Sequence, residues 1–310
     1  RLIALKKELG ILFKYGTQER LVECNIKVID DVLCIWDGQG DSFSYNKQNF
    51  LSQQIQETLF NEKRILIEDC LFGVDLNPKA VSICNLRLWV ELLKNAYYKN
   101  GIMETLPNID INIKCGNSLI SRMNFESGKK IGAKNADLDK SSKGLIQDYK
   151  QQVKRYKAVA DKREKQQVIQ TIEQLKSDLH SSCFQLSLFE PVPKKIIDLY
   201  DNAFEWAFEF PEVMSEDGVF LGFDCVIGNP PYVQLQTMGR ETDKLKEMHY
   251  LTYSRMGDIY CLFYELGRKI LNSNGLLSFI TSNKWMRAGY GETLRNFLAA
   301  NTNPLLLVDF

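Results

Sequence analysis

Short apolar runs alternate with helical patterns along most of this chain, and this order predicts an α/β fold. Strands are predicted at 71–75, 109–115, 223–227 and 276–281, where apolar residues follow one another without a helical period. Helices are predicted at 48–69, 77–94 and 258–271. Because strands and helices alternate, the sheet should be mainly parallel.

Smaller elements are predicted around this core. Leu2, Leu5 and Leu9 recur at helical spacing. Residues 21–45 alternate between apolar and polar and predict a small β-hairpin excursion with a turn at 37–40. A helix at 196–208, a helix-capping role for Gly275 and a final strand-like run at 305–308 complete the pattern.

The α/β alternation stops between about residues 123 and 195, and this segment divides the chain into three parts. Residues 1–122 form the N-terminal part of the core, 123–195 a helical, Lys-rich insertion, and 196–310 the C-terminal part. Lysine and arginine outnumber acidic residues over 129–165. That excess could contact a phosphate backbone or form solvated helix faces, and both interpretations remain open.

Composition excludes several classes of protein. The chain has 310 residues, 45% of them hydrophobic, and a net charge of zero, so no global charge favours nucleic acid. Eight cysteines without a Cys-x-x-Cys pair read as small buried residues of a reducing cytosol. With two histidines, neither a metal site nor a Ser-His-Asp triad is expected. No signal peptide or membrane-length run occurs, so a cytoplasmic protein without a membrane partner is predicted, whereas its oligomeric state is not.

The most informative motif is Asn229-Pro230-Pro231-Tyr232, which follows the apolar run 223–227 and Gly228. Open α/β sheets bind ligands at the carboxyl ends of their strands. The Asn229 Oδ1 atom and the rigidly held carbonyl of Pro230 could accept both hydrogens of a planar amino group, while Tyr232 covers a ring. The same four residues also suit an ordinary turn.

Two further polar residues follow predicted strands. Asp75 stands between a strand and the helix that Asn77 and Pro78 would start, where related folds hold the hydroxyls of a ribose. It could instead simply cap that helix. Asn117 follows the next strand and could read an adenine edge or serve as a turn residue.

Three ordered motifs, at 71–78, 115–119 and 223–232, resemble those of adenine-specific (N6) DNA methyltransferases, in particular the core of fused type IIG restriction-modification enzymes. Residues 208–213 and 281–285 also suit that family. The resemblance implies a Rossmann-like class I methyltransferase core that uses S-adenosyl-L-methionine and acts on double-stranded DNA. The parent enzyme could also carry a type II endonuclease.

The resemblance also implies roles for individual residues. Asp75 would bind the ribose of S-adenosylmethionine, Leu76 would pack beside its adenine, and Asn117 would face the same ring. Asn229 and Pro230 would accept hydrogen bonds from the target amine, and Tyr232 would stack on the flipped base. Trp285 would close the other face of the target-base pocket.

One departure from the family is the glycine-rich cofactor loop, which does not occur between Arg1 and Asp75. We expect it, with the first cofactor-loop strand, to lie upstream, so that this segment alone would not bind cofactor. A recognition domain and any nuclease are also expected outside the chain. Two alternatives stay open: an RNA or protein-glutamine methyltransferase with the same Asn-Pro-Pro-Tyr site, and a non-catalytic scaffold segment that binds DNA.

Overall fold

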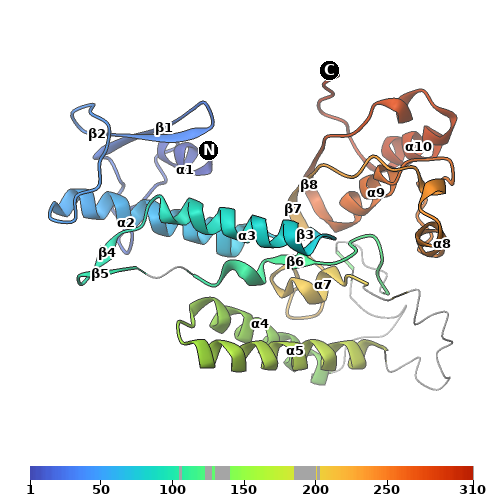
Figure 1. The fold of residues 1–310 in the computed structure, drawn as a ribbon, viewed down its shortest axis with the longest axis horizontal. Coiled ribbons are helices and arrows are strands. Elements are labelled where there is room, and N and C mark those ends of the chain that lie inside the picture. Colours follow the sequence, from blue (N-terminus) through green and yellow to red (C-terminus); the bar gives the residue numbers. More distant parts are fainter. Residues whose placement is uncertain (105–106, 123–127, 130–139, 185–199, 201–202, 310) are drawn as a thin grey trace. The chain divides into compact units, whose positions relative to one another are not determined.

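The computed structural model describes residues 1–310 except 105–106, 123–127, 130–139, 185–199, 201–202 and 310 (Figure 1). The chain forms two compact units, which are described separately. Unit 1 comprises Arg1–Gly73, Asn77–Lys114 and Arg155–Lys165, and unit 2 comprises Val74–Leu76, Cys115–Lys154 and Gln166–Phe310. The predicted boundary at 123, the boundary at 195 and the start of the predicted helix at 196 lie outside the described residues.

Unit 1 consists of a hairpin and helices. Its elements are α1 (Leu2–Glu8), β1 (Cys24–Ile29), β2 (Val32–Asp37), α2 (Phe50–Ile65), a π-helical turn (Leu66–Cys70), α3 (Pro78–Leu93), β4 (Tyr98–Lys99), β5 (Ile102–Met103) and a 3-10 turn (Ile109–Ile111). The predicted hairpin excursion is confirmed, because β1 and β2 pair antiparallel. Asp30 and Asp31 close it with positive φ angles of 48° and 62°, as a two-residue hairpin turn requires.

Two apolar clusters hold unit 1 together. The first joins α1, β1 and α2 through residues such as Ile3, Ile26 and Leu59. The second joins α2 and α3, with Phe60 and Leu92 at its centre. The start of α3 follows from sequence, since the Asn77 Oδ1 atom accepts a hydrogen bond from the Lys79 amide at 2.9 Å and proline occupies the first turn.

Strands β3 (Gly73–Asp75) and β6 (Ile113–Cys115) pair with each other and form a two-stranded sheet. Both are shorter than predicted. The prediction of a strand from 109 was wrong, because Ile109–Ile111 forms a 3-10 turn. Asn112 ends that turn and donates its side-chain amide to three backbone carbonyls, of Ile67, Glu68 and Leu71, which holds the preceding chain in place.

Unit 2 contains another two-stranded sheet, with helices around it. Its elements are β7 (Phe223–Gly228), β8 (Leu271–Phe279), α7 (Trp206–Glu209), α8 (Arg240–Glu247), α9 (Tyr260–Ile270), α10 (Glu292–Asn301) and 3-10 turns at Pro211–Val213, Leu235–Thr237, Lys284–Met286 and Gly289–Gly291. Helices α4 (Lys140–Ala158) and α5 (Lys162–Phe184) form the described part of the insertion and divide between the units. Strands β7 and β8, labelled in Figure 1, run parallel, as predicted. Their last pair is Gly228–Phe279.

The two faces of this parallel pair differ. One face carries Leu277 and Phe279, and α9 packs so close to them that a Cβ atom on Gly267 would lie 2.7 Å from Leu277. Since side chains alternate along a strand, the other face carries Ile227, Leu276 and Ile280, which are exposed. Helix α9 thus supports the strands whose ends carry the Asn229 motif.

Several other predictions need correction. Gly275 does not cap a helix, because α9 ends at Ile270 and Gly275 lies inside β8. The predicted helix at 196–208 starts only at Trp206 among the described residues, since Ala203 forms a parallel bridge with Asn117. The run 305–308 is exposed and is not part of a strand.

The cysteines also differ from the prediction. Cys24 and Cys261 are buried, whereas Cys70, Cys115 and Cys225 are exposed. Cys34 and Cys84 lie between these extremes, and the side chain of Cys183 is outside the described residues. Apolar neighbours in sequence did not ensure burial, because each exposed thiol lies at an element end or on an uncovered strand face.

Candidate active site

The Asn229 motif begins where strands β7 and β8 end. Gly228 is the last residue of β7, and its carbonyl accepts a hydrogen bond from the Ile280 amide at 3.1 Å. Asn229 and Tyr232 are exposed, whereas Pro230 is buried. The motif therefore lies at the carboxyl edge of a parallel strand pair, where α/β folds bind ligands.

A hydrogen bond links the first and last residues of the motif. The Tyr232 hydroxyl lies 3.0 Å from the Asn229 Oδ1 atom and 3.0 Å from the Ile280 carbonyl oxygen. A hydroxyl has one hydrogen, so these two acceptors share it. The contact orients the Asn229 amide, and the Ile280 carbonyl offers the hydroxyl a second partner at equal distance.

The Pro230 carbonyl is the second acceptor that the sequence predicted. No donor within the described residues bonds to it. The two prolines remove two N–H donors from the motif and fix its backbone, so this carbonyl oxygen keeps its direction without a partner. Asn229 and Pro230 thus supply two acceptor oxygens, one held by Tyr232 and one without a donor in the described residues, and neither residue carries an acidic or basic group.

Aromatic side chains pack behind the motif. The rings of Tyr232 and Tyr260 meet edge to face, with centroids 6.2 Å apart. Tyr260 belongs to a buried cluster that also contains Tyr264, Tyr290 and Trp285. Trp285 is half-buried and its ring lies 6.0 Å from that of Tyr264, so the structure brings this predicted pocket residue into the cluster behind Tyr232. Its indole N–H is buried and lacks an acceptor in the described part of the chain, which is an energetically costly arrangement.

The other predicted residues lie at or just after the ends of β3 and β6. Because the Gly116 amide donates to the Asp75 carbonyl at 3.1 Å, the two neighbouring strand ends stay together past their last paired residues. Asp75 and Leu76 are exposed, with Leu76 69% accessible. The Asn117 Oδ1 atom accepts a hydrogen bond from the Leu119 amide at 3.2 Å, which fixes its amide plane.

Residues distant in sequence hold the Asn117 loop. The Tyr250 hydroxyl donates to the Leu119 carbonyl at 2.9 Å, and the Trp206 indole donates to the Ser118 carbonyl at 3.2 Å. A Cβ atom on Gly116 would lie 2.7 Å from the Phe204 ring. Burial raises the pKa of Tyr250, so this hydroxyl stays protonated as a donor. Sequence analysis missed Tyr250, because no local pattern relates it to a carbonyl 131 residues earlier.

Many basic residues of the insertion are paired. In unit 2, Lys143 binds Asp217 at 2.6 Å and Lys176 binds Glu209 at 2.7 Å. In unit 1, Lys165 binds Asp110 at 3.3 Å, and further pairs join Lys157 to Asp69 and Arg155 to Glu164. These contacts favour a structural role for the paired lysines over contact with a phosphate backbone. Residues 130–139, which carry part of the predicted excess, lie outside the described residues.

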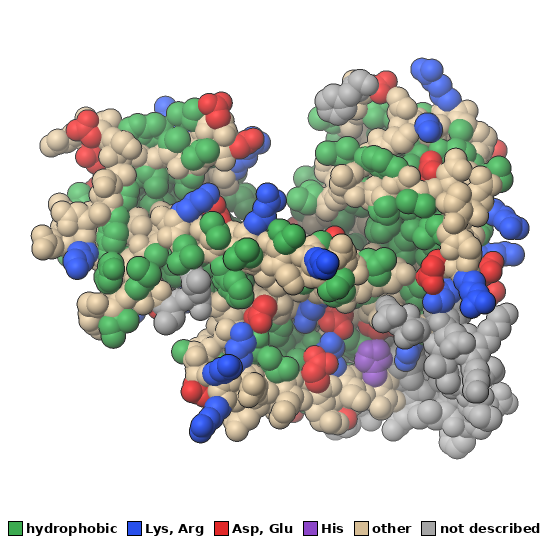
Figure 2. Space-filling view, viewed as in Figure 1, with side chains coloured by type: hydrophobic (Ala, Val, Ile, Leu, Met, Phe, Trp, Pro, Cys, Tyr) green, Lys and Arg blue, Asp and Glu red, His purple; other side chains and the backbone are tan. Residues whose placement is uncertain are grey.

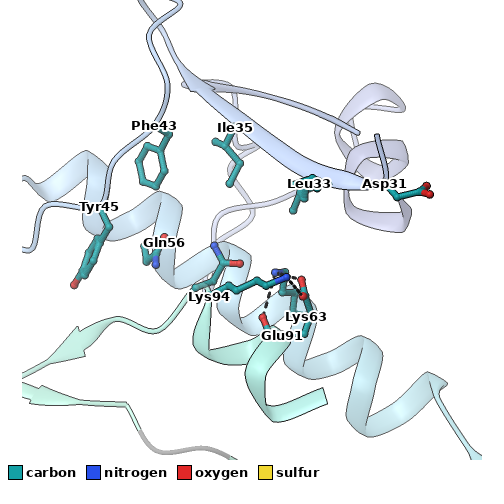
Figure 3. A pocket seen from close by; sticks show the side chains of 11 residues that line it. Asp31, Leu33, Ile35, Phe43, Tyr45, Gln56, Lys63, Glu91 and Lys94 are labelled. Carbon is teal, nitrogen blue, oxygen red and sulfur yellow. Dashed lines mark hydrogen bonds and ion pairs between the residues drawn. The ribbon is translucent and has the colours of Figure 1, made fainter. Parts of the chain in front are cut away.

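A cavity of about 390 Å³ lies in unit 1, between the β1–β2 hairpin and helices α2 and α3 (Figure 3). It contains none of the predicted site residues. Both lysines that line it bind its glutamate, since the Lys63 and Lys94 amines each lie 2.6 Å from an oxygen of Glu91. No sequence pattern predicted this cavity.

Two further properties concern the described ranges alone. No three His, Cys, Asp or Glu side chains in them gather closely enough to hold a metal ion. No helix in them is both long and apolar enough to cross a membrane.

Comparison with known proteins relates the chain to restriction-modification enzymes. It is 26% identical over 277 residues to a candidate type II restriction enzyme and methyltransferase of Methanocaldococcus jannaschii, which covers 72% of the chain and 22% of that protein. It is 23% identical over 287 residues to the type II restriction enzyme and methyltransferase RM.Eco57I of Escherichia coli, covering 91% of the chain and 20% of that protein. Over 89 residues it is 33% identical to the type II methyltransferase M.BstVI of Geobacillus stearothermophilus, 29% of the chain and 16% of that protein.

The chain thus spans about a fifth of the length of the first two relatives. No solved structure matches it. The family model of the Eco57I restriction-modification methylases matches residues 69–310, which include β3, β6, β7, β8 and every predicted site residue. By this match, the chain belongs to the Eco57I restriction-modification methylase family.

Proposed function

We propose that this chain carries the site at which an adenine of double-stranded DNA is methylated on its N6 amine. The observation that carries the proposal is the pair of acceptors at the end of β7, the Asn229 Oδ1 atom and the Pro230 carbonyl, beside an exposed Tyr232 ring. An N6 amine has two hydrogens and a flat, delocalised nitrogen. Two fixed acceptors match its hydrogens and favour the tetrahedral geometry that the nitrogen needs when it is methylated.

The hydroxyl of Tyr232 has a defined part in this proposal. It now shares its hydrogen between the Asn229 Oδ1 atom and the Ile280 carbonyl. When a target amine donates to Asn229, the hydroxyl turns fully to Ile280 and keeps one good acceptor. Binding of the amine therefore costs no unsatisfied donor, and the Tyr232 ring remains in place to stack on the flipped base.

No strong general base is needed for this reaction. Positive charge develops on the amine nitrogen during transfer and is stabilised by the same two oxygens, and the proton then leaves to solvent. Removal of one preorganised contact of this kind typically lowers the rate by about 10² to 10³. The acceptor pair is therefore the part of the site most sensitive to substitution.

The methyl donor in this proposal is S-adenosyl-L-methionine, which supplies an electrophilic methyl group on a sulfonium centre. Asp75 would accept hydrogen bonds from its ribose hydroxyls, and the exposed Leu76 side chain would cover its adenine. Asn117 would face that ring with an amide plane already fixed by Leu119. The exposed carboxylate can accept hydrogen bonds from the ribose hydroxyls, and the exposed apolar side chain beside it can pack on the adenine ring.

Cysteine labelling tests this cofactor site without measuring activity. The exposed Cys115 thiol donates to the Leu76 carbonyl at 3.6 Å, whereas the exposed Cys70 belongs to unit 1. We expect S-adenosylmethionine to slow alkylation of Cys115 in the full-length protein and to leave Cys70 unchanged, as measured by peptide mass spectrometry. Equal rates with and without the molecule would refute the assignment of Asp75, Leu76 and Asn117.

The reaction itself is tested with the full-length protein, unmodified DNA and S-adenosylmethionine, followed by digestion to nucleosides and mass spectrometry for N6-methyladenine. We expect the product with the wild type, almost none with Asn229→Ala, and wild-type amounts with Asn25→Ala, which removes an exposed asparagine from β1. Equal product from Asn229→Ala would refute the role of Asn229.

The same assay separates the alternatives. Product with RNA or with glutamine-containing protein, but not with DNA, would favour the other methyltransferase classes that use this motif. Cofactor binding without transfer to any of these substrates would favour a non-catalytic scaffold. The relatives favour DNA, because each is named as a type II restriction enzyme or methyltransferase.

A further inference from the structure

Tyr232 is a large, exposed side chain whose ring must face one direction to stack on a base. Tyr232 is 54% accessible, so without a specific contact its side chain would be free to change rotamer. Among the described residues, the Tyr232 ring contacts one other ring, that of Tyr260. The two rings meet edge to face, with an angle of 81° between their planes. Tyr260 is fully buried, so it gives Tyr232 a fixed surface to rest against.

The position of Tyr260 is in turn fixed by its hydroxyl. That hydroxyl lies 3.1 Å from the Tyr290 hydroxyl, which donates to the Asp258 Oδ2 atom at 2.9 Å. A carboxylate only accepts, so the hydrogen of Tyr290 goes to Asp258 and the hydrogen of Tyr260 goes to Tyr290. Burial raises the pKa of both tyrosines, so both hydroxyls keep the hydrogens that this chain of contacts needs.

Asp258, the last member of this hydrogen-bonded series, is also linked to the segment of Tyr232 through backbone hydrogen bonds. The Ile259 amide donates to the Val233 carbonyl at 2.9 Å, and the Leu235 amide donates to the Gly257 carbonyl at 2.9 Å. These bonds pair the residues after Tyr232 with the residues around Asp258. The ring of Tyr232, the two buried tyrosines, Asp258 and the paired backbone thus form a closed loop of contacts.

We propose that Tyr260, Tyr290 and Asp258 are positioning residues that hold the Tyr232 ring in the orientation needed to stack on the target base. They touch neither the base nor the acceptors, and they act through Tyr232. The inference rests on the proposed adenine methylation and adds three residues to it. Sequence analysis noted Asp258 only as the start of a helix.

The close approach of Gly257 supports the arrangement. A Cβ atom on this residue would lie 3.2 Å from the Tyr290 ring and 3.1 Å from the Ser254 carbonyl oxygen. Glycine therefore lets Tyr290 lie directly against the chain that precedes Asp258. A side chain here would press on the middle member of the hydrogen-bonded series.

The test compares two conservative variants in the full-length protein, Tyr260→Phe and Tyr290→Phe, which remove one hydroxyl each and keep both rings. The matched control is Tyr149→Phe, which removes a buried hydroxyl that donates to the Phe208 carbonyl at 2.5 Å, in the same unit but outside the cluster that contains Tyr260 and Tyr290. Each variant is assayed for kcat, for KM with DNA and with S-adenosylmethionine, and for thermal unfolding. Base extrusion is followed with a duplex that has 2-aminopurine at the mapped target position.

We expect Tyr260→Phe and Tyr290→Phe to lower kcat on the order of 10-fold and to reduce the 2-aminopurine fluorescence plateau, with KM for cofactor unchanged. Tyr149→Phe should lose as much stability but keep kcat and the plateau. Asp258→Asn retains an acceptor for Tyr290 and should keep most of the rate, whereas Asp258→Ala should resemble Tyr290→Phe.

The outcomes separate this inference from the proposed function. A wild type that methylates adenine, together with Tyr260→Phe and Tyr290→Phe variants that match Tyr149→Phe in kcat and fluorescence, would overturn the positioning role alone. A wild type that transfers no methyl group to DNA would overturn the proposed function, and the positioning role would fall with it.

Discussion

Gly291 and Gly289, two residues apart in one 3-10 turn, should respond in opposite ways to alanine. A Cβ atom on Gly291 would lie 1.9 Å from the Trp285 carbonyl oxygen and within 2.8 Å of two more backbone atoms of Trp285. The nearest atoms belong to the backbone, so no rotamer change relieves the clash. Around Gly289, in contrast, no atom lies within 4 Å of an added Cβ atom.

The size of the effect follows from the contacts that must move. Overpacking typically costs about 1–3 kcal/mol. The backbone shift would also disturb the hydrogen bond from the Arg295 guanidinium to the Trp285 carbonyl, 2.6 Å long, and bonds of charged groups are worth roughly 1.5–3 kcal/mol. We therefore expect Gly291→Ala to lower the free energy of unfolding by about 4 kcal/mol. Gly289→Ala should stay within roughly 0.5 kcal/mol of the wild type.

Urea denaturation followed by tryptophan fluorescence measures both variants. For an m value of about 3 kcal/mol/M, the loss predicted for Gly291→Ala moves the midpoint down by roughly 1 M. Midpoints that coincide for Gly291→Ala, Gly289→Ala and the wild type would refute the reasoning, because they would mean that Trp285 does not lie against Gly291. The functional counterpart is a loss of methylation in Gly291→Ala at temperatures where it remains folded, since Trp285 would be displaced.

Three other predictions concern single groups. Tyr156→Phe removes a buried hydroxyl that lies 3.0 and 2.9 Å from the two carboxylate oxygens of Asp110, so it should cost about 2 kcal/mol of unfolding free energy in a urea titration, and an unchanged midpoint would contradict it. Burial raises the pKa of the Cys24 thiol to about 11, above its ordinary value of about 8.5, so the folded protein holds this proton more tightly. Stability should thus be complete below about pH 8.5 and fall toward pH 11, and Cys24→Ala should flatten this part of the curve of midpoint against pH. Asn229→Asp keeps an acceptor oxygen at the same place and should retain more methylation than Asn229→Ala when the two rates are measured side by side. Equal rates would contradict this, because they would mean that the acceptor oxygen alone is not sufficient without the amide nitrogen.

The sequence predicted elements well where the signal is local. Asn77 and Pro78 mark the start of α3 because capping and the first-turn proline act within a few residues. The apolar run before Gly228 predicts β7 for a similar reason. Gly275 shows the limit of local signals. Glycine often follows a helix, but here α9 ends at Ile270 and the chain enters β8 directly. A rule that considers glycine alone cannot distinguish a helix cap from a position within a strand.

The residues of the candidate site also differ in how well sequence could predict them, according to whether their partners are close or distant in sequence. Asn229, Pro230 and Tyr232 lie within four residues, so the motif itself indicated their chemistry. Their supports, such as the Ile280 carbonyl and the Tyr260 ring, come from segments that only the folded sheet brings near. The predicted burial was wrong for Cys70, Cys115 and Cys225 for a related reason, because strand face and position at an element end decide exposure and the neighbouring residues in sequence do not.

Apolar side chains also reach the surface along α3 in unit 1, where Ile83, Leu86, Val90 and Leu93 recur at intervals of three and four residues (Figure 2). Exposed apolar stripes of this kind promote association. The sequence predicted this helix but not the exposure of these side chains, because periodicity reveals an apolar face and not what covers it.

The ion pairs of α4 and α5 make salt a probe of this molecule. The lysines that bind Glu209 and Asp110 are partly screened from solvent, so added ions compete for them more weakly than for the exposed pair of Lys143 and Asp217. Helix attachment should therefore loosen gradually as ionic strength rises, before the apolar core responds. The dependence of DNA affinity on salt would then have two sources. One is the release of counterions from the duplex, and the other is the loosening of these helices within the protein.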